Sequence, residues 1–127
     1  VTPVLNQVQH IEKCILSVLE QDCDVQYIII DGDSTDGTVD IIRKYESRIS
    51  FWVSEPDSGQ SHAINKGLKL AKGTFFNWLN ADDRLTPNAL KSVLEIASEE
   101  TQVIIGKCEH IDENGNQVAV GGAKIWD

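Results

Sequence analysis

Hydrophobic and polar positions along the chain follow two periods, and the chain changes from one to the other repeatedly. Apolar residues recur every three or four positions, as on one face of an α-helix, over residues 10–21, 38–45, 61–71 and 87–98. Short apolar or alternating runs, which are typical of β-strands, cover residues 1–5, 25–30, 49–53, 74–79 and 103–108. The dipeptide Asn114-Gly115 predicts a hairpin turn, with residues 117–120 as the returning strand.

The predicted elements pass from strand to helix four times and end with a strand and a hairpin. This order predicts an α/β fold, a three-layer sandwich with a mostly parallel, doubly wound sheet, helices on both faces and a C-terminal hairpin. The length of 127 residues suits a single domain, residues 1–127. Because such sheets bind ligands at the carboxyl ends of their strands, we expect functional residues in the polar clusters that follow the strands.

The formal net charge of −9 narrows the expected partners. It argues against nucleic acid, and it means that a bound diphosphate would need a metal cation between it and the protein. The alternative is that the charge serves solubility alone. No apolar run approaches the ~20 residues of a transmembrane helix, and no leader peptide is visible. Cys14, Cys23 and Cys108 lack a metal-binding spacing, so we expect reduced thiols and a cytoplasmic location.

The first polar cluster, DGDSTDGT at residues 31–38, directly follows an apolar strand. Its glycines allow a tight turn and a close approach to a ligand, and its carboxylates can accept hydrogen bonds from a base or a ribose. For Asp31 the functional interpretation is favoured, because helix capping does not require a carboxylate in the strand. For residues 34–38 the favoured interpretation is capping of the next helix.

The second cluster, NADD at residues 80–83, ends the predicted fourth strand. Adjacent carboxylates repel each other unless a cation lies between them, and carboxylate oxygens suit Mg²⁺ or Mn²⁺. This favours a metal site at Asp82 and Asp83, and the alternative is a loop with solvated acids or a cap.

The third cluster comprises a loop and the start of a helix, residues 54–67. Asp57 in the loop and Lys66 in the helix are candidates for binding a donor ligand, although Lys66 alone also fits a solvated helix charge. The sequence has neither a G-x-x-x-x-G-K-[ST] loop nor a G-x-G-x-x-G motif after the first strand. This disfavours a nucleotide triphosphatase and an ordinary dinucleotide dehydrogenase.

Together these segments resemble glycosyltransferase family 2, a family of inverting enzymes with the GT-A fold. The resemblance covers nearly the whole chain through TPVLN (2–6), IDGDSTDGT (30–38), residues 54–67 and WLNADD (78–83). It implies a nucleotide-diphospho-sugar transferase-like fold, a donor sugar linked to UDP, GDP or dTDP, and Mn²⁺ or Mg²⁺ as cofactor.

The resemblance also implies roles for individual residues. Asp31, with Asp33 beside it, would contact the base or ribose, and Pro3 and Asn6 would shape the floor under the nucleoside. Asp82 would lie near the ribose and the donor sugar. Asp83 would be the principal ligand of the metal that bridges the diphosphate, with Asp82 secondary.

Three positions depart from the common family pattern. Leu5 stands where many members place an aromatic residue on the base, and Gly32 stands where many carry a second Asp. Ile64 replaces a common Arg, so the metal, with Lys66 as a further candidate, would meet the diphosphate charge.

The implied reaction moves a sugar to an acceptor hydroxyl with inversion at the anomeric carbon. The acceptor would be a glycan, a lipid-linked glycan or a protein, and the enzyme would be cytoplasmic, either free or peripheral at the inner face of the membrane. The chain is expected to be truncated before the acceptor-binding region. The catalytic base is therefore expected beyond Asp127, and no catalytic residue is assigned.

Two alternatives stay open at the level of the sequence. One is a non-catalytic nucleotide-sugar-binding module. The other is a receiver-type signalling domain that binds Mg²⁺, in which Asp31 or Asp82 would accept a phosphoryl group.

Overall fold

The computed structural model describes residues 1–112 and 114–122. The chain forms two compact units, Val1–Ser92 and Val93–Asp127, and each is described by itself. The single domain predicted from the length stays a prediction.

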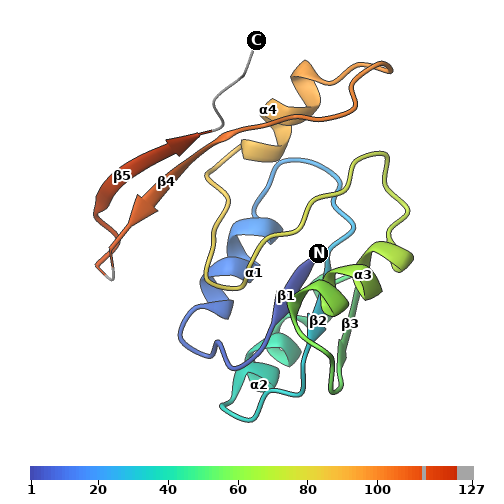
Figure 1. Ribbon diagram of the computed structural model, residues 1–127, viewed down its shortest axis with the longest axis vertical. Helices are drawn as coiled ribbons and strands as arrows, with labels where there is room; N and C mark the ends of the chain where they lie inside the picture. The colour runs from blue at the N-terminus through green and yellow to red at the C-terminus, as the bar shows by residue number, and fades with distance from the viewer. Residues whose placement is uncertain (113, 123–127) are drawn as a thin grey trace. The chain divides into compact units, whose positions relative to one another are not determined.

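The first unit is built on three parallel strands, β1 (Thr2–Val4), β2 (Ile28–Asp31) and β3 (Phe51–Ser54), in the order β1-β2-β3 (Figure 1). The strands are in register, with Thr2 opposite Ile29 and Ile28 opposite Phe51. Their carboxyl ends therefore meet at one edge of the sheet, as the sequence predicts.

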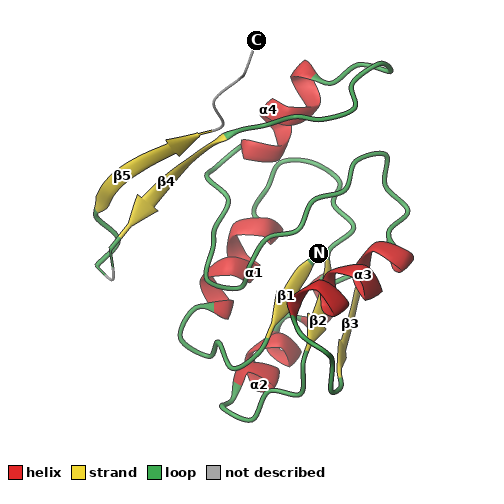
Figure 2. Ribbon diagram, in the orientation of Figure 1, coloured by secondary structure: helices red, strands yellow, loops and turns green. Residues whose placement is uncertain are grey.

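Helices cover both faces of this sheet (Figure 2). Ile29 of β2 belongs to the core formed with α1 (Ile11–Leu19) and α2 (Thr38–Lys44), whereas Ile28 and Ile30 pack with Ala63 of α3 (Gln60–Leu70). A short 3₁₀ helix, Glu46–Arg48, leads into β3. Side chains of a strand alternate between faces, so three consecutive isoleucines fit only a strand that is buried on both. The predicted three-layer α/β arrangement is confirmed.

The strand predicted over residues 74–79 is wrong, because no regular strand forms there. Two backbone hydrogen bonds join this segment to Val1, from the Val1 amino group to Asn77 O (2.8 Å) and from Leu79 N to Val1 O (2.9 Å). Both bonds involve one residue, and a strand needs a ladder of such bonds along its partner. The segment thus lies beside the edge of β1 without extending the sheet.

The chain after this segment forms α4 (Ala89–Ile96), β4 (Lys107–Ile111) and β5 (Gln117–Gly122). The last two form an antiparallel hairpin, so the predicted turn and returning strand are confirmed. The Asp112 carboxylate accepts hydrogen bonds from the backbone N–H of Asn114 (2.9 Å) and Asn116 (2.8 Å), which stabilises the turn. Of the strand predicted over 103–108, only the last two residues are in a strand, and they pair within this hairpin.

No helix within residues 1–112 or 114–122 is long and apolar enough to cross a membrane.

Candidate functional site

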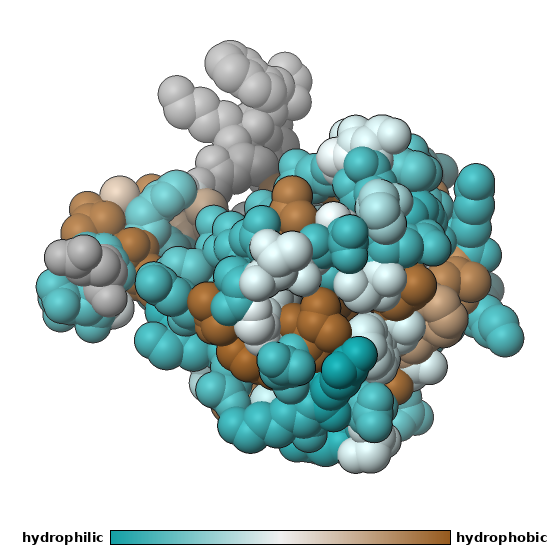
Figure 3. All heavy atoms as spheres, turned by 90° about the horizontal axis from the view of Figure 1, so that it is seen from below, coloured by the Kyte–Doolittle hydropathy of each residue, from teal (hydrophilic) through white to brown (hydrophobic). Residues whose placement is uncertain are grey.

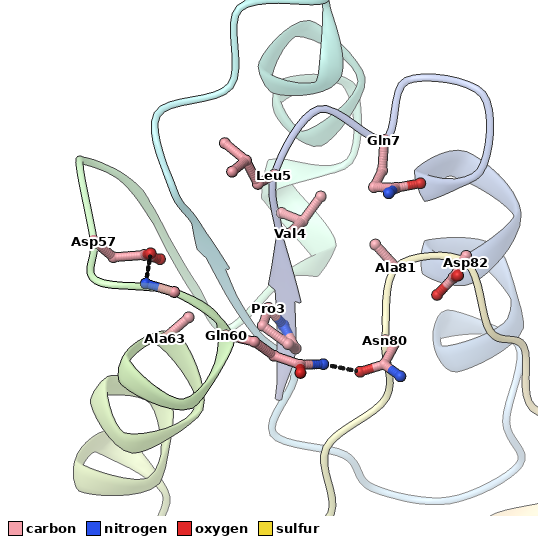
Figure 4. Close-up of a pocket in the computed structure, with 11 residues that line it drawn as sticks. Pro3, Val4, Leu5, Gln7, Asp57, Gln60, Ala63, Asn80, Ala81 and Asp82 are labelled. Carbon is pink, nitrogen blue, oxygen red and sulfur yellow. Dashed lines mark hydrogen bonds between the residues drawn. The ribbon is translucent and has the colours of Figure 1, made fainter.

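A pocket of about 380 Å³ lies in the first unit, where the end of β1 approaches the start of α3 and residues 80–82 (Figure 4). Eleven residues line it: Pro3, Val4, Leu5, Gln7, Asp57, Gly59, Gln60, Ala63, Asn80, Ala81 and Asp82. Figure 3 shows the molecule from below the view of Figure 1, which is the side toward which β2 and β3 point. Hydrophilic side chains cover most of this face. Small groups of hydrophobic side chains lie among them.

The end of β1 gives the pocket its apolar part. Pro3 is buried, while the Leu5 side chain is 54% exposed. Asn6 follows with a φ of 51°, in the left-handed region that asparagine tolerates better than most residues. Its backbone N–H donates to Ser34 Oγ (2.7 Å) and its Oδ1 accepts from Thr35 N–H (2.9 Å). Asn6 therefore fastens the loop after β2 to the end of β1.

Asp31 is fully buried at the end of β2 and is not part of the pocket lining. Its carboxylate accepts three hydrogen bonds, from Ser34 N–H (2.9 Å), Ser34 Oγ (2.5 Å) and Ser54 Oγ (2.6 Å). These bonds join β2, β3 and the 31–38 loop, and they meet the requirement that a buried carboxylate be hydrogen-bonded. The predicted contact of Asp31 with a base stays a prediction. In this structure its carboxylate oxygens accept hydrogen bonds from Ser34 in the loop and from Ser54.

The remainder of the 31–38 loop prepares the start of α2. Asp36 Oδ1 accepts from Thr38 Oγ1 (2.6 Å) and Thr38 N–H (3.0 Å), and Oδ2 accepts from Val8 N–H (3.0 Å). The bonds from Thr38 and from these backbone groups hold the pKa of Asp36 below its ordinary value. The N-cap of α2 is Gly37, with no side-chain cap bond, so the predicted capping by side chains of residues 34–36 is not seen at the cap itself, and Thr38 N–H donates instead to Asp36, the residue before the cap. Asp33 is exposed, with a φ of 73°.

Asp57 lies directly against Gly32. A Cβ atom on Gly32 would be 3.1 Å from Asp57 Oδ2, and Gly59 N–H donates to Asp57 Oδ1 at 2.7 Å. The Asp57 carboxylate is thus held at the wall of the pocket, next to the space that a side chain at position 32 would enter. A side chain at position 32 would therefore require the Asp57 carboxylate to shift slightly.

Asp82 and Asp83 lie on a tight turn that Asp83 N–H closes by donating to Asn80 O (3.0 Å). Both side chains are exposed, and within the part of the chain that the structure describes neither has a hydrogen-bond or ion-pair partner. Asp82 lines the pocket, whereas Asp83 does not. The Gln60 amide donates to Asn80 Oδ1 (2.6 Å) and so links this turn to the start of α3.

The oxygens of Asp82 and Asp83 fit a hard divalent cation. No cluster of three or more His, Cys, Asp or Glu side chains suitable for a metal occurs among residues 1–112 and 114–122. Mg²⁺ needs only one or two protein carboxylates when phosphate oxygens and water complete its shell. The pair therefore suits an ion that binds together with a phosphate ligand.

Lys66 is engaged elsewhere in this structure. Its Nζ donates to Glu55 Oε1 at 2.8 Å, and this hydrogen bond lowers the pKa of Glu55. The described pocket lining holds two carboxylates and no lysine or arginine. A contact between Lys66 and a diphosphate stays a prediction.

Residues 1–123 match the family described as "Glycosyl transferase family 2". The chain belongs to this family. Glycosyl transferase family 2 relatives include TuaG of Bacillus subtilis, provisionally named a teichuronic acid biosynthesis glycosyltransferase, which is 38% identical over 78% of this chain and 41% of its own length. The GalNAc(5)-diNAcBac-PP-undecaprenol beta-1,3-glucosyltransferase of Campylobacter jejuni is 31% identical over 91% of this chain and 39% of its own length. The chain thus spans about two fifths of these relatives.

Solved structures of glycosyltransferases share the fold. TarS of S. aureus in complex with UDP has a TM-score of 0.68 and 28% identity over 75% of this chain and 30% of its own. The mannosyltransferase PcManGT of Pyrobaculum calidifontis, solved with GDP-Man and Mn²⁺, has a TM-score of 0.68 and 24% identity over 84% of this chain and 32% of its own. The predicted GT-A fold is confirmed.

The sequence of this family 2 chain did not predict the pocket residue Gln60 or the two serines that bind the Asp31 carboxylate. Gln60 lines the pocket and reaches across to the acidic turn, but in the sequence it is an ordinary polar residue before a helix. Ser34 and Ser54 hold the Asp31 carboxylate from two different segments. Their position after an apolar strand is the only signal in the sequence.

Proposed function

We propose that the protein transfers a sugar from a nucleotide-diphosphate sugar to an acceptor hydroxyl, with inversion and with the help of a divalent cation. The observation that carries this proposal is the pocket at the carboxyl edge of the sheet, which is lined by residues from three family motifs and holds carboxylates but no cationic side chain. Family membership and the likeness to TarS, solved with UDP, support it.

The apolar side of the pocket suits a nucleoside. Leu5 is exposed over Pro3 and Val4, and it offers an aliphatic surface to a base in place of an aromatic ring. The Asp57 carboxylate accepts hydrogen bonds only, so it would recognise an N–H of the base or a hydroxyl of the ribose. Asp31, with Asp33 beside it, would contact the base or ribose, and Pro3 and Asn6 would shape the floor under the nucleoside. UDP-, GDP- and dTDP-linked sugars all carry suitable donors.

The acidic turn is the proposed metal site, with Asp83 as principal ligand and Asp82 as second ligand beside the donor sugar. When bound, Mn²⁺ or Mg²⁺ would neutralise charge on the leaving diphosphate. The free oxygens of both side chains and the net charge of −9 support this assignment. Without a cation, these carboxylates would repel the diphosphate.

The acceptor side of the reaction belongs to the whole protein. A glycan, a lipid-linked glycan or a protein would supply the hydroxyl, and no general base is assigned within residues 1–127. We place the reaction in the cytoplasm, free or at the inner membrane surface. The three cysteines, which are all free, support this location.

Calorimetry with UDP, GDP and dTDP, each with and without Mn²⁺, tests the proposal. We expect one of the three to bind, with an affinity that depends on the metal. A chain that binds none of them under either condition would refute the proposed donor site. For inversion, the anomeric configuration of the product made by the full-length protein is read by NMR.

A further inference from the structure

Helix α1 turns a row of polar side chains toward the segment that carries the acidic turn. Cys14, Ser17 and Gln21 follow one another at intervals of three and four residues, so they lie on one face of the helix and its C-terminal end. Each contacts the chain between positions 80 and 90. This face is distinct from the apolar positions Ile11, Ile15 and Val18, which pack into the core.

The Ser17 hydroxyl makes the central contact. It donates to Cys14 O within the helix (2.7 Å), which leaves its oxygen free to accept from Leu85 N–H (3.1 Å). One helical turn before Ser17, Cys14 Sγ donates to the backbone O of Asn80 (3.5 Å). The acidic turn, residues 80–83, is thus held at its start and just beyond its end.

Gln21 is the last residue of the row, and both the nitrogen and the oxygen of its side-chain amide make hydrogen bonds. Its Nε2 donates to Ser17 O (2.9 Å) and to Thr86 O (3.0 Å), and its Oε1 accepts from Leu90 N–H (3.0 Å). Residues 81–88 have no helix or strand of their own. Side-chain bonds from α1 therefore take the place of a backbone ladder in fixing this segment.

We propose that Ser17 and Gln21 are positioning residues for Asp82 and Asp83, so that the geometry of the metal site is set by α1. The inference rests on the proposed role of the acidic turn. Neither side chain would touch the ligand. Groups that hydrogen-bond directly to metal ligands contribute about 10–100-fold to metal affinity. Ser17 and Gln21 bond the backbone beyond the acidic turn, so we expect their effect at the lower end of this range.

The test uses the whole chain with Ser17→Ala and Gln21→Ala, each compared with the parent. Ser17→Thr keeps the hydroxyl and serves as the conservative variant. Gln26→Ala is the matched control, because the Gln26 amide makes an equivalent pair of bonds to another segment, to Leu70 O (3.1 Å) and from Lys72 N–H (2.7 Å). Urea unfolding measures the general loss of stability in every variant.

The first readout is hydrogen exchange at the Asp83 amide, which bonds within the turn and contacts neither variant site. We expect faster exchange at Asp83 in Ser17→Ala and Gln21→Ala, and the parental rate in Ser17→Thr and Gln26→Ala. This measurement needs no ligand, so it decides the positioning role even if no nucleotide binds and the proposed function fails. Parental exchange at Asp83 in both alanine variants would overturn the inference.

The second readout is the affinity for Mn²⁺ at a fixed concentration of UDP, GDP or dTDP, whichever binds the parent. We expect it to fall about tenfold in Ser17→Ala and Gln21→Ala and to be unchanged in Ser17→Thr and Gln26→Ala. An equal loss in Gln26→Ala at equal stability would show a general structural effect and would overturn the inference.

Discussion

Replacing Gly32 with Asp would place a second carboxylate beside Asp57. Gly32 does not have a positive φ, so its backbone accepts a side chain. The new Cβ would lie 3.1 Å from Asp57 Oδ2 and 3.4 Å from its Cγ, and Gly59 N–H holds that carboxylate in place. Asp57 must therefore move slightly, and the two negative groups are then close neighbours. Many members of the family place an aspartate at this position, so the variant tests whether Asp57 serves in its place here.

The expected magnitude follows from Coulomb's law. Two unit charges about 4 Å apart interact by ~1 kcal/mol in water and by ~4 kcal/mol at an effective dielectric constant of about 20. Asp57 is half-buried, which places it between these limits. We expect Gly32→Asp to lower the free energy of unfolding at neutral pH by about 1–2 kcal/mol relative to Gly32→Asn, which has the same shape without the charge.

The assay is urea unfolding of both variants at several pH values, together with calorimetry of nucleotide binding. The repulsion raises the pKa of the carboxylate pair in the folded state, so the difference between the variants should shrink as the pH falls through that raised pKa. The double variant Gly32→Asp, Asp57→Asn should recover stability and nucleotide binding. Equal stability of Gly32→Asp and Gly32→Asn at neutral pH would refute the reasoning, as would a double variant that recovers neither property.

Three further predictions concern the metal site, the packing and the link between two helices. Asp83→Asn should abolish metal-dependent nucleotide binding with the fold intact. Asp82→Asn should weaken nucleotide-sugar binding and largely spare metal–diphosphate binding. Calorimetry that shows the opposite order of effects would contradict the assignment. Gly67→Ala should destabilise the fold by about 1–3 kcal/mol in urea unfolding, because its Cβ would overlap the Val1 side chain; unchanged stability would contradict this packing argument. The Glu12 carboxylate accepts from Lys44 Nζ (2.7 Å), and this hydrogen bond lowers the pKa of Glu12. Glu12→Gln should therefore lower the melting temperature at neutral pH, by an amount that vanishes as the pH falls through the lowered pKa; a difference independent of pH would exclude this cause.

The sequence by itself determined the layers of the fold and the edge that holds the site. Three consecutive isoleucines, Ile28–Ile30, require burial on both faces, and this demands a helix on each side of the sheet. The turn at Asn114 is equally local, since its bonds come from neighbouring residues. Polar clusters that follow successive strands must meet at one edge when those strands are parallel. These features follow from local patterns, so they can be read from the chain.

Only the tertiary structure decided what the individual polar residues contact. Asp31 is turned inward to Ser34 and Ser54, although a carboxylate after a strand can equally face a ligand. Lys66 is paired with Glu55, which precedes it by eleven positions. Residues 74–79 have the composition of a strand but lack a ladder of bonds to a neighbour, because both of their backbone bonds beside the sheet are to Val1, the residue before β1. Each of these outcomes depends on at least one group that is distant in sequence, and periodicity carries no information about which distant groups will meet.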